Sequence, residues 1–166
     1  LAARAEISLP RVFTDNMVLQ RDQPVPIWGK AKVGEKITVE FAGQKNIATA
    51  DAGGKWKVIL NPLAASAAPR TLQVGGRQFT NVLVGEVWLA AGQSNMEFPL
   101  SREQFAATEI PSATNSLLRL LNFSFAGQYF YAKPFGANEA ARQTPEKFYS
   151  GAWQPCSPDA AKEFSA

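Results

Sequence analysis

The feature that most constrains the fold is a repeated alternation of apolar and polar residues between residues 7 and 84. It is clearest in "KITVEF" at 36–41 and in "KWKVIL" at 55–60. A period of two is typical of strands with one buried face, because successive side chains point to opposite sides of a sheet. The side chains that we expect to point inward include Val39, Phe41, Trp56 and Val58.

Turn-forming residues separate these segments, as in "VGEK" at 33–36, "DAGGK" at 51–55 and "VGGR" at 74–77. Roughly seven short strands at a spacing of about 8–12 residues are typical of an antiparallel sandwich. We therefore predict that residues 7–84 form an antiparallel β-sandwich domain with no helix longer than two turns. Further strands are expected at "NMVLQ", "VPIWG", "KNIATA", "TLQV" and "FTNVLV".

The pattern changes after residue 84. "LVGEVWLAAG" at 83–92 and "TNSLLRLLNF" at 114–123 are rich in consecutive apolar residues, which is typical of strands buried on both faces of a parallel sheet. Helix signals also appear here. Ser101 with Gln104 forms a capping-box pattern, and Ser157–Pro158 is a typical helix start. Residues 85–166 thus begin an α/β pattern that we expect to be incomplete in this chain.

Composition argues against several classes of protein. The net charge is only +3, and the basic residues are scattered from Arg4 to Lys162, so we expect no nucleic-acid binding. No apolar run approaches the ~20 residues that span a membrane. The single cysteine, Cys156, excludes an internal disulfide and a multi-cysteine zinc site, and we expect no metal or cofactor. Ala3-Arg4-Ala5 has the small-x-small form of a signal cleavage site, which predicts export to the periplasm or the extracellular space.

Ser94 follows the first apolar run in "AAGQSNMEF" at 90–98. A sharp turn after a strand exposes a serine hydroxyl and leaves backbone N–H groups free to stabilise an oxyanion. Gly92 removes a Cβ that would obstruct such a bend. A polar turn without a catalytic role has the same local pattern. Moreover, the 166 residues contain no histidine that could accept the proton of a nucleophilic serine.

"AAGQSNMEF" resembles the nucleophile block of the SGNH hydrolases, in the form found in the sialate O-acetylesterase group. The resemblance extends upstream through "LPRVFTDNMVLQRDQPVPIWGKAKVGEKITVEFAGQ", "GKWKVILNPL" and "NVLVGEVWLAAGQSNM", and downstream to "WQPCSPDAAKEFSA". It implies a β-sandwich followed by the start of an SGNH-like, flavodoxin-like α/β hydrolase domain at 85–166. The implied reaction is hydrolysis of O-acetyl esters on sialic acid or on the sugars of acetylated polysaccharides.

Carried over by motif, the resemblance makes Ser94 the nucleophile and its backbone N–H an oxyanion donor, with Gln93 and Asn95 as candidate binding residues. The family's Asp-x-x-His block does not occur here, and the available aspartates have no histidine to orient: Asp15, Asp22, Asp51 and Asp159. We therefore expect the remainder of the hydrolase domain, on a second chain or a missing segment, to pair with 86–91 and bring a histidine. This chain alone would be inactive. The alternative is a non-catalytic β-sandwich module that binds carbohydrate or protein.

Three further features have two interpretations each. Trp28, Trp56 and Trp88 could line a sugar platform, but their apolar or alternating neighbours favour packing in the core. The aromatic residues between 129 and 135 could face a substrate or cover the sheet. Cys156 is expected to be a buried thiol, or the partner of a cysteine outside this chain.

Overall fold

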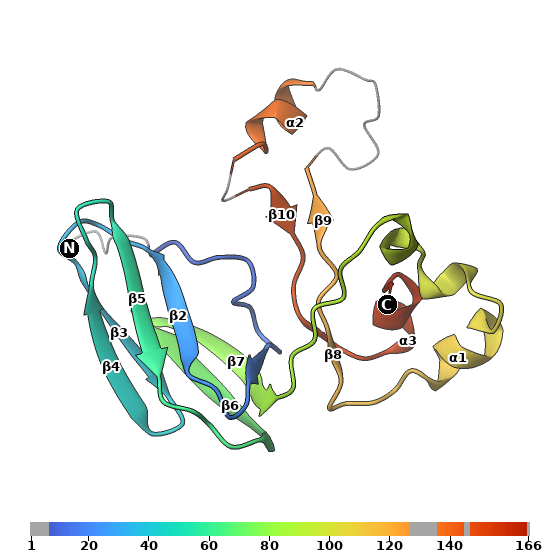
Figure 1. Ribbon diagram of the computed structural model, residues 1–166, viewed down its shortest axis with the longest axis horizontal. Helices are drawn as coiled ribbons and strands as arrows, with labels where there is room; N and C mark the ends of the chain where they lie inside the picture. The colour runs from blue at the N-terminus through green and yellow to red at the C-terminus, as the bar shows by residue number, and fades with distance from the viewer. Residues whose placement is uncertain (1–6, 127–135, 145–146, 166) are drawn as a thin grey trace. The chain divides into compact units, whose positions relative to one another are not determined.

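The computed structural model describes residues 7–126, 136–144 and 147–165 (Figure 1). Its contacts divide the chain into two units, Leu1–Leu89 and Ala90–Ala166, which we call the first and the second unit. The sequence predicts two domains, residues 7–84 and 85–166, and this division stays a prediction. The Ala3-Arg4-Ala5 site and the aromatic residues at 129–135 lie outside the described residues.

The first unit is built from strands, and its residues 7–89 contain no helix, as the alternation predicts. The strands are β1 (Val18–Gln20), β2 (Val25–Lys30), β3 (Lys36–Phe41), β4 (Gln44–Thr49), β5 (Lys55–Leu60), β6 (Ser66–Val74) and β7 (Arg77–Gly85).

These strands form two sheets, one of five strands in the order β1-β7-β6-β3-β4 and one of two strands, β2-β5. All neighbouring strands run antiparallel except β1 and β7, which are parallel. The prediction of a wholly antiparallel arrangement is therefore wrong at this pair. The physical reason is that β1 and β7 are far apart in the chain, so no hairpin forces them to run in opposite directions. The sandwich packing itself stays a prediction.

Side chains on β4 join the two sheets. Asn46 Nδ2 donates to the Ile59 carbonyl at 2.8 Å, and the Gln44 amide exchanges two hydrogen bonds with the backbone of Asn61, at 2.8 and 3.2 Å. An edge strand such as β4 has unpaired backbone groups, and no backbone pairing joins it to β5. The side-chain amides of Gln44 and Asn46 make the connection instead. The first unit is thus mostly sheet, and side-chain hydrogen bonds connect its two sheets where β4 lies next to β5 (Figure 1).

The interior of the first unit lies where the alternation predicts it. Val39, Phe41, Trp56 and Val58 are all buried, which confirms their expected inward orientation. Burial of each aliphatic side chain stabilises the fold by roughly 1.5–3 kcal/mol, so the interior is a large part of what holds the sheets together. Its fully buried side chains include Met17, Ile27, Ile37, Leu60, Leu72, Val74 and Val82.

The expectation that three tryptophans pack in the core is right for Trp56 and wrong for the other two. Trp28 is 40% exposed, because Val25 and Ile27 take the inward positions of β2 and leave Trp28 on the outer face. Trp88 is 88% exposed, because it lies beyond the end of β7.

The apolar run at 86–91 is not a strand in this structure. β7 ends at Gly85, and no described segment pairs with the residues that follow, of which Leu89 is 91% exposed. The predicted buried strand is absent because a β-strand needs backbone hydrogen bonds to a neighbouring strand, and no described segment provides them here. Among the described residues, Gln20 and Arg21 hold the start of the run, and Arg21 Nε lies 3.7 Å from Glu86 Oε1. The Gln20 side chain accepts a hydrogen bond from Val87 N at 2.8 Å and donates one to Glu86 Oε2 at 3.1 Å.

The second unit consists of short elements. These are the 3₁₀ helices η1 (Ser94–Glu97) and η2 (Leu100–Arg102), the helices α1 (Ala106–Ser112), α2 (Ala137–Ala141) and α3 (Pro158–Lys162), and the strands β8 (Arg119–Leu120), β9 (Ser124–Phe125), β10 (Tyr149–Ser150) and β11 (Gln154–Pro155). The strands form two antiparallel pairs, β8 with β11 and β9 with β10. No helix among the described residues is long and apolar enough to cross a membrane.

Two local predictions for the second unit are wrong. Ser101 does not cap a helix, since α1 begins only at Ala106; instead, the Glu103 carboxylate accepts a hydrogen bond from Phe105 N at 2.6 Å. The expected core strand at 114–123 shrinks to the two residues of β8, because its described partner β11 is equally short.

The predicted start of the last helix is confirmed. Ser157 precedes α3, its hydroxyl oxygen accepts a hydrogen bond from Ala160 N at 3.2 Å, and Pro158 is the first helical residue. A serine cap and a proline at the first position both suit helix N-termini, where backbone N–H groups lack internal partners.

Candidate active site

Ser94 is the first residue of η1 and follows Gln93, which is extended with φ −97° and ψ −151°. The turn is closed by a hydrogen bond from Met96 N to the Gln93 carbonyl at 2.9 Å. The N–H groups of Ser94 and Asn95 have no acceptor within the part of the chain that the structure describes. An exposed serine hydroxyl and two free N–H groups therefore lie within one turn.

Gly92 is required at the entrance to this turn by a close approach. A Cβ at Gly92 would lie 2.7 Å from Cγ of Met96, closer than such atoms can come without a shift. The half-buried Met96 side chain thus occupies the space that a larger residue at 92 would need. This explains structurally why a glycine precedes the serine by two positions.

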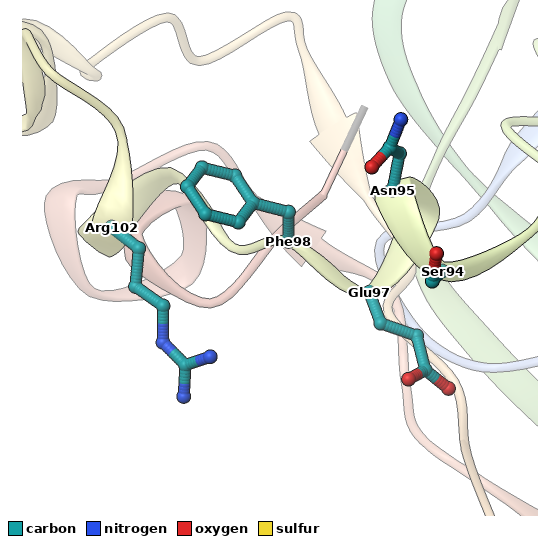
Figure 2. A pocket seen from close by; sticks show the side chains of 5 residues that line it. All are labelled: Ser94, Asn95, Glu97, Phe98 and Arg102. Atoms are coloured by element: carbon teal, nitrogen blue, oxygen red, sulfur yellow. The ribbon is translucent and has the colours of Figure 1, made fainter.

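A hollow of about 280 Å³ opens beside the turn (Figure 2). The sequence predicted Ser94 and Asn95 here, whereas Gln93 does not line the hollow. Sequence reasoning missed the remaining members, because only the conformation of the chain between residues 94 and 102 brings them to one hollow. All of the lining residues come from 94–102: Ser94, Asn95, Glu97, Phe98 and Arg102.

The described residues offer no general base to Ser94. Its hydroxyl forms no hydrogen bond with any of them. In the view of Figure 2 it extends toward Asn95, whereas Glu97 and Arg102 extend to the other side of the ribbon. Glu97 and Arg102 are exposed, and neither forms an ion pair with a described residue.

The four aspartates considered as partners of a histidine have structural roles instead. Asp15 accepts hydrogen bonds from Thr80, and Asp51 accepts them from the backbone of its own turn. Asp22 and Asp159 pair with exposed basic residues close in the chain. None of them is among the residues that line the hollow.

Residues that follow α3 support the Ser94 turn. The Ser165 hydroxyl donates to the Asn95 carbonyl at 3.3 Å, and Leu100 N donates to the Phe164 carbonyl at 3.0 Å. Segments about 70 residues apart in sequence thus share hydrogen bonds at the site. Cys156, which precedes α3, is a buried free thiol, one of the two states expected for it.

No family model matches the chain. The sialate O-acetylesterase of Mus musculus is 34% identical over 115 residues, and that of Rattus norvegicus is 30% identical over 113 residues; each match covers 59% of this chain. The chain spans about a fifth of the length of these curated relatives, 21% of each.

A solved structure is similar over nearly the whole chain. The crystal structure of a novel carbohydrate acetylesterase from Xanthomonas citri matches with a TM-score of 0.75 and 34% sequence identity, over 97% of this chain and 35% of that one. The resemblance to the sialate O-acetylesterase group is thereby confirmed: the chain is similar in sequence to two sialate O-acetylesterases, and it shares its fold with part of a carbohydrate acetylesterase.

Proposed function

We propose that this chain carries the nucleophile of a carbohydrate O-acetylesterase of the SGNH type, and that Ser94 is that nucleophile. The observation that supports the proposal is the position of Ser94. It is exposed, it opens a 3₁₀ turn beside a hollow, and its N–H and that of Asn95 are free of described acceptors. The acetylesterases similar to this chain provide the reaction class.

In the proposed reaction the Ser94 oxygen attacks the carbonyl carbon of a sugar-bound acetyl group while its proton passes to a base. The negative charge then rests on the former carbonyl oxygen, where the N–H groups of Ser94 and Asn95 can donate to it. Collapse of this intermediate breaks the bond to the sugar oxygen, which takes up the proton. Water then attacks the acetyl-serine, releasing acetate and restoring the hydroxyl.

The base lies outside these 166 residues in this proposal, because the chain contains no histidine and Ser94 has no described hydrogen-bond partner. We expect a segment on a second chain, or elsewhere in the same protein, to pair with 86–91 and to bring a histidine close to the Ser94 hydroxyl. The exposed side chains of Trp88 and Leu89 would then be covered, since apolar surface of this kind marks a contact site. Without that segment the chain would have no esterase activity.

The substrate in this proposal is an O-acetylated sugar, either a sialic acid or a unit of an acetylated polysaccharide. Phe98 and Arg102 contribute an apolar ring and a cation to the lining of the hollow. An aromatic ring can pack against the apolar face of a sugar, and a guanidinium can bind a carboxylate on an acidic sugar. Export of the protein remains part of the proposal, because Ala3-Arg4-Ala5 has the small-x-small form of a signal cleavage site.

The decisive experiment replaces Ser94 with alanine in the complete enzyme. The Ser94→Ala variant should lose at least about a thousandfold in kcat on an aryl acetate and on an O-acetylated sugar, as the loss of a nucleophile does in other serine hydrolases. Thermal unfolding should be unchanged, because an exposed serine contributes little to packing.

A matched control is Ser101→Ala, which removes an exposed hydroxyl from the same unit but away from the hollow. It should retain the full turnover. Comparable activity in Ser94→Ala would show that another residue is the nucleophile. Activity of residues 1–166 alone on an aryl acetate would show that no external base is needed.

A further inference from the structure

The outer face of the β2–β5 sheet presents an aromatic ring among cations. Inward positions of both strands are buried, and the outward positions are exposed. In the register of the pair, Trp28 lies opposite Lys57 and Lys30 lies opposite Lys55. The six outward side chains, which we call the lysine–tryptophan face, are Pro26, Trp28, Lys30, Lys55, Lys57 and Ile59.

Two lysines of the lysine–tryptophan face, Lys55 and Lys57, have no carboxylate partner among the described residues. None of the six side chains of this face is acidic. The nearest carboxylate in sequence is Asp51, whose Oδ1 accepts hydrogen bonds from Gly53 N and Lys55 N in the adjoining turn.

Trp28 is held so that part of its ring remains available. Its indole meets Phe13 edge to face, with 4.9 Å between ring centroids and 75° between the planes. Phe13 is buried, which fixes one side of the indole while 40% of Trp28 remains exposed. A residue opposite on the neighbouring strand lies about 5 Å away, and one two positions along lies about 7 Å away, so cations surround an oriented ring.

We infer that the lysine–tryptophan face binds an acidic glycan chain in a site separate from the Ser94 hollow. The apolar face of a sugar ring would pack on the exposed indole, and carboxylates of neighbouring sugars would pair with Lys55 and Lys57. Charge complementarity selects an acidic ligand, and the choice of a glycan rests on the proposed carbohydrate esterase function. The first unit would then hold the polymer on which the Ser94 hollow acts.

The test measures binding of the 166-residue chain to an oligogalacturonate that carries no acetyl groups. A neutral galactan oligosaccharide of equal length is the comparison ligand. The double variant Lys55→Gln/Lys57→Gln should raise the Kd for oligogalacturonate about tenfold, as expected from two partly exposed ion pairs. Binding should weaken as salt is added, and the Trp28 indole N–H resonance should shift on titration.

The matched control is Lys36→Gln, which removes the same charge from an exposed position on β3 in the five-stranded sheet. Its Kd should stay within about twofold of the unmodified chain, since distant exposed charges are screened by salt. Trp28→Ala should also weaken binding, but it disturbs the contact with Phe13. The lysine double variant, whose side chains are exposed, is therefore the decisive one.

Three results would overturn the inference: an unchanged Kd in the double variant, equal binding of the neutral oligosaccharide, or equal binding of a DNA oligonucleotide of the same charge. The last of these would indicate a general anion site. Ser94→Ala should bind the oligogalacturonate normally. Turnover by the Ser94→Ala enzyme would disprove the proposed nucleophile, whereas failed glycan binding by the unmodified chain would disprove only this site.

Discussion

Apolar side chains are buried in the paired strands of the first unit and exposed in a run of the second unit. In the first unit Leu72 and Val74 of β6 are fully buried, because β3 and β7 pair with β6 on its two sides. In the second unit Leu117 and Leu118 are exposed, although the run they belong to is just as apolar. The comparison indicates that an apolar run becomes a buried strand where a described segment pairs along its length.

The largest expected difference is in amide hydrogen exchange. Amides of β3 and β6 should exchange at least about a thousandfold more slowly than those of 86–93, because paired core strands open only with the whole unit. Exchange measured by mass spectrometry on the 166-residue chain tests this. Equal rates would mean that 86–93 is paired in solution. Addition of the proposed complementary segment should slow exchange at 86–91 specifically.

The next effect is on stability. Leu72→Ala should lower the free energy of unfolding of the first unit by about 2–5 kcal/mol, because it leaves a cavity in a packed core. The control Leu118→Ala, at an exposed position of the second unit, should change it by no more than about 0.5 kcal/mol. Urea unfolding followed by tryptophan fluorescence, to which the buried Trp56 contributes, gives both values. Similar losses for the two variants would contradict the contrast between the units.

A smaller effect is expected at the entrance to the Ser94 turn. Gly92→Ala should destabilise the turn by about 1–3 kcal/mol, since the added methyl group meets Cγ of Met96. The kcat/KM of the complete enzyme should fall accordingly. The double variant Gly92→Ala/Met96→Ala removes the clash and should recover most of that loss. Absence of recovery would show that Met96 is not the cause.

The smallest effect concerns the cap of α3. Ser157→Ala should destabilise this helix by about 1 kcal/mol, because Ala160 N loses its acceptor. Ser157→Asn, which can also cap a helix, should retain the stability. Exchange of the amides at 160–162, measured by NMR, separates the two variants. Equal behaviour of both would mean that Pro158 alone defines the helix start.

Much of the first unit could be predicted from the sequence, because alternation and turn residues act locally. Every strand expected from a quoted segment between residues 16 and 84 is present, and the inward residues of β3 and β5 are the predicted ones. The parallel pairing of β1 with β7 could not be predicted, since it joins segments more than sixty residues apart. Long-range partners leave no local signal.

Part of the candidate site could likewise be predicted from the sequence, and part could not. The motif around Ser94 predicted an exposed serine on a turn, and the structure has one. Glu97, Phe98 and Arg102 were missed as lining residues, because only the turn geometry brings them around one hollow. The support that Ser165 gives to the Asn95 carbonyl was equally inaccessible, since the two residues are 70 positions apart.

The sequence by itself determined the β character of residues 7–84, the buried faces of β3 and β5, the serine turn and the serine-proline start of α3. Each of these depends on side-chain spacing or on backbone preferences within a few residues. Only the tertiary structure decided that Trp28 faces outward beside Lys57, and that the apolar run after Gly85 is not a strand. Both depend on which segments lie next to one another, because exposure and strand pairing are properties of neighbours in space.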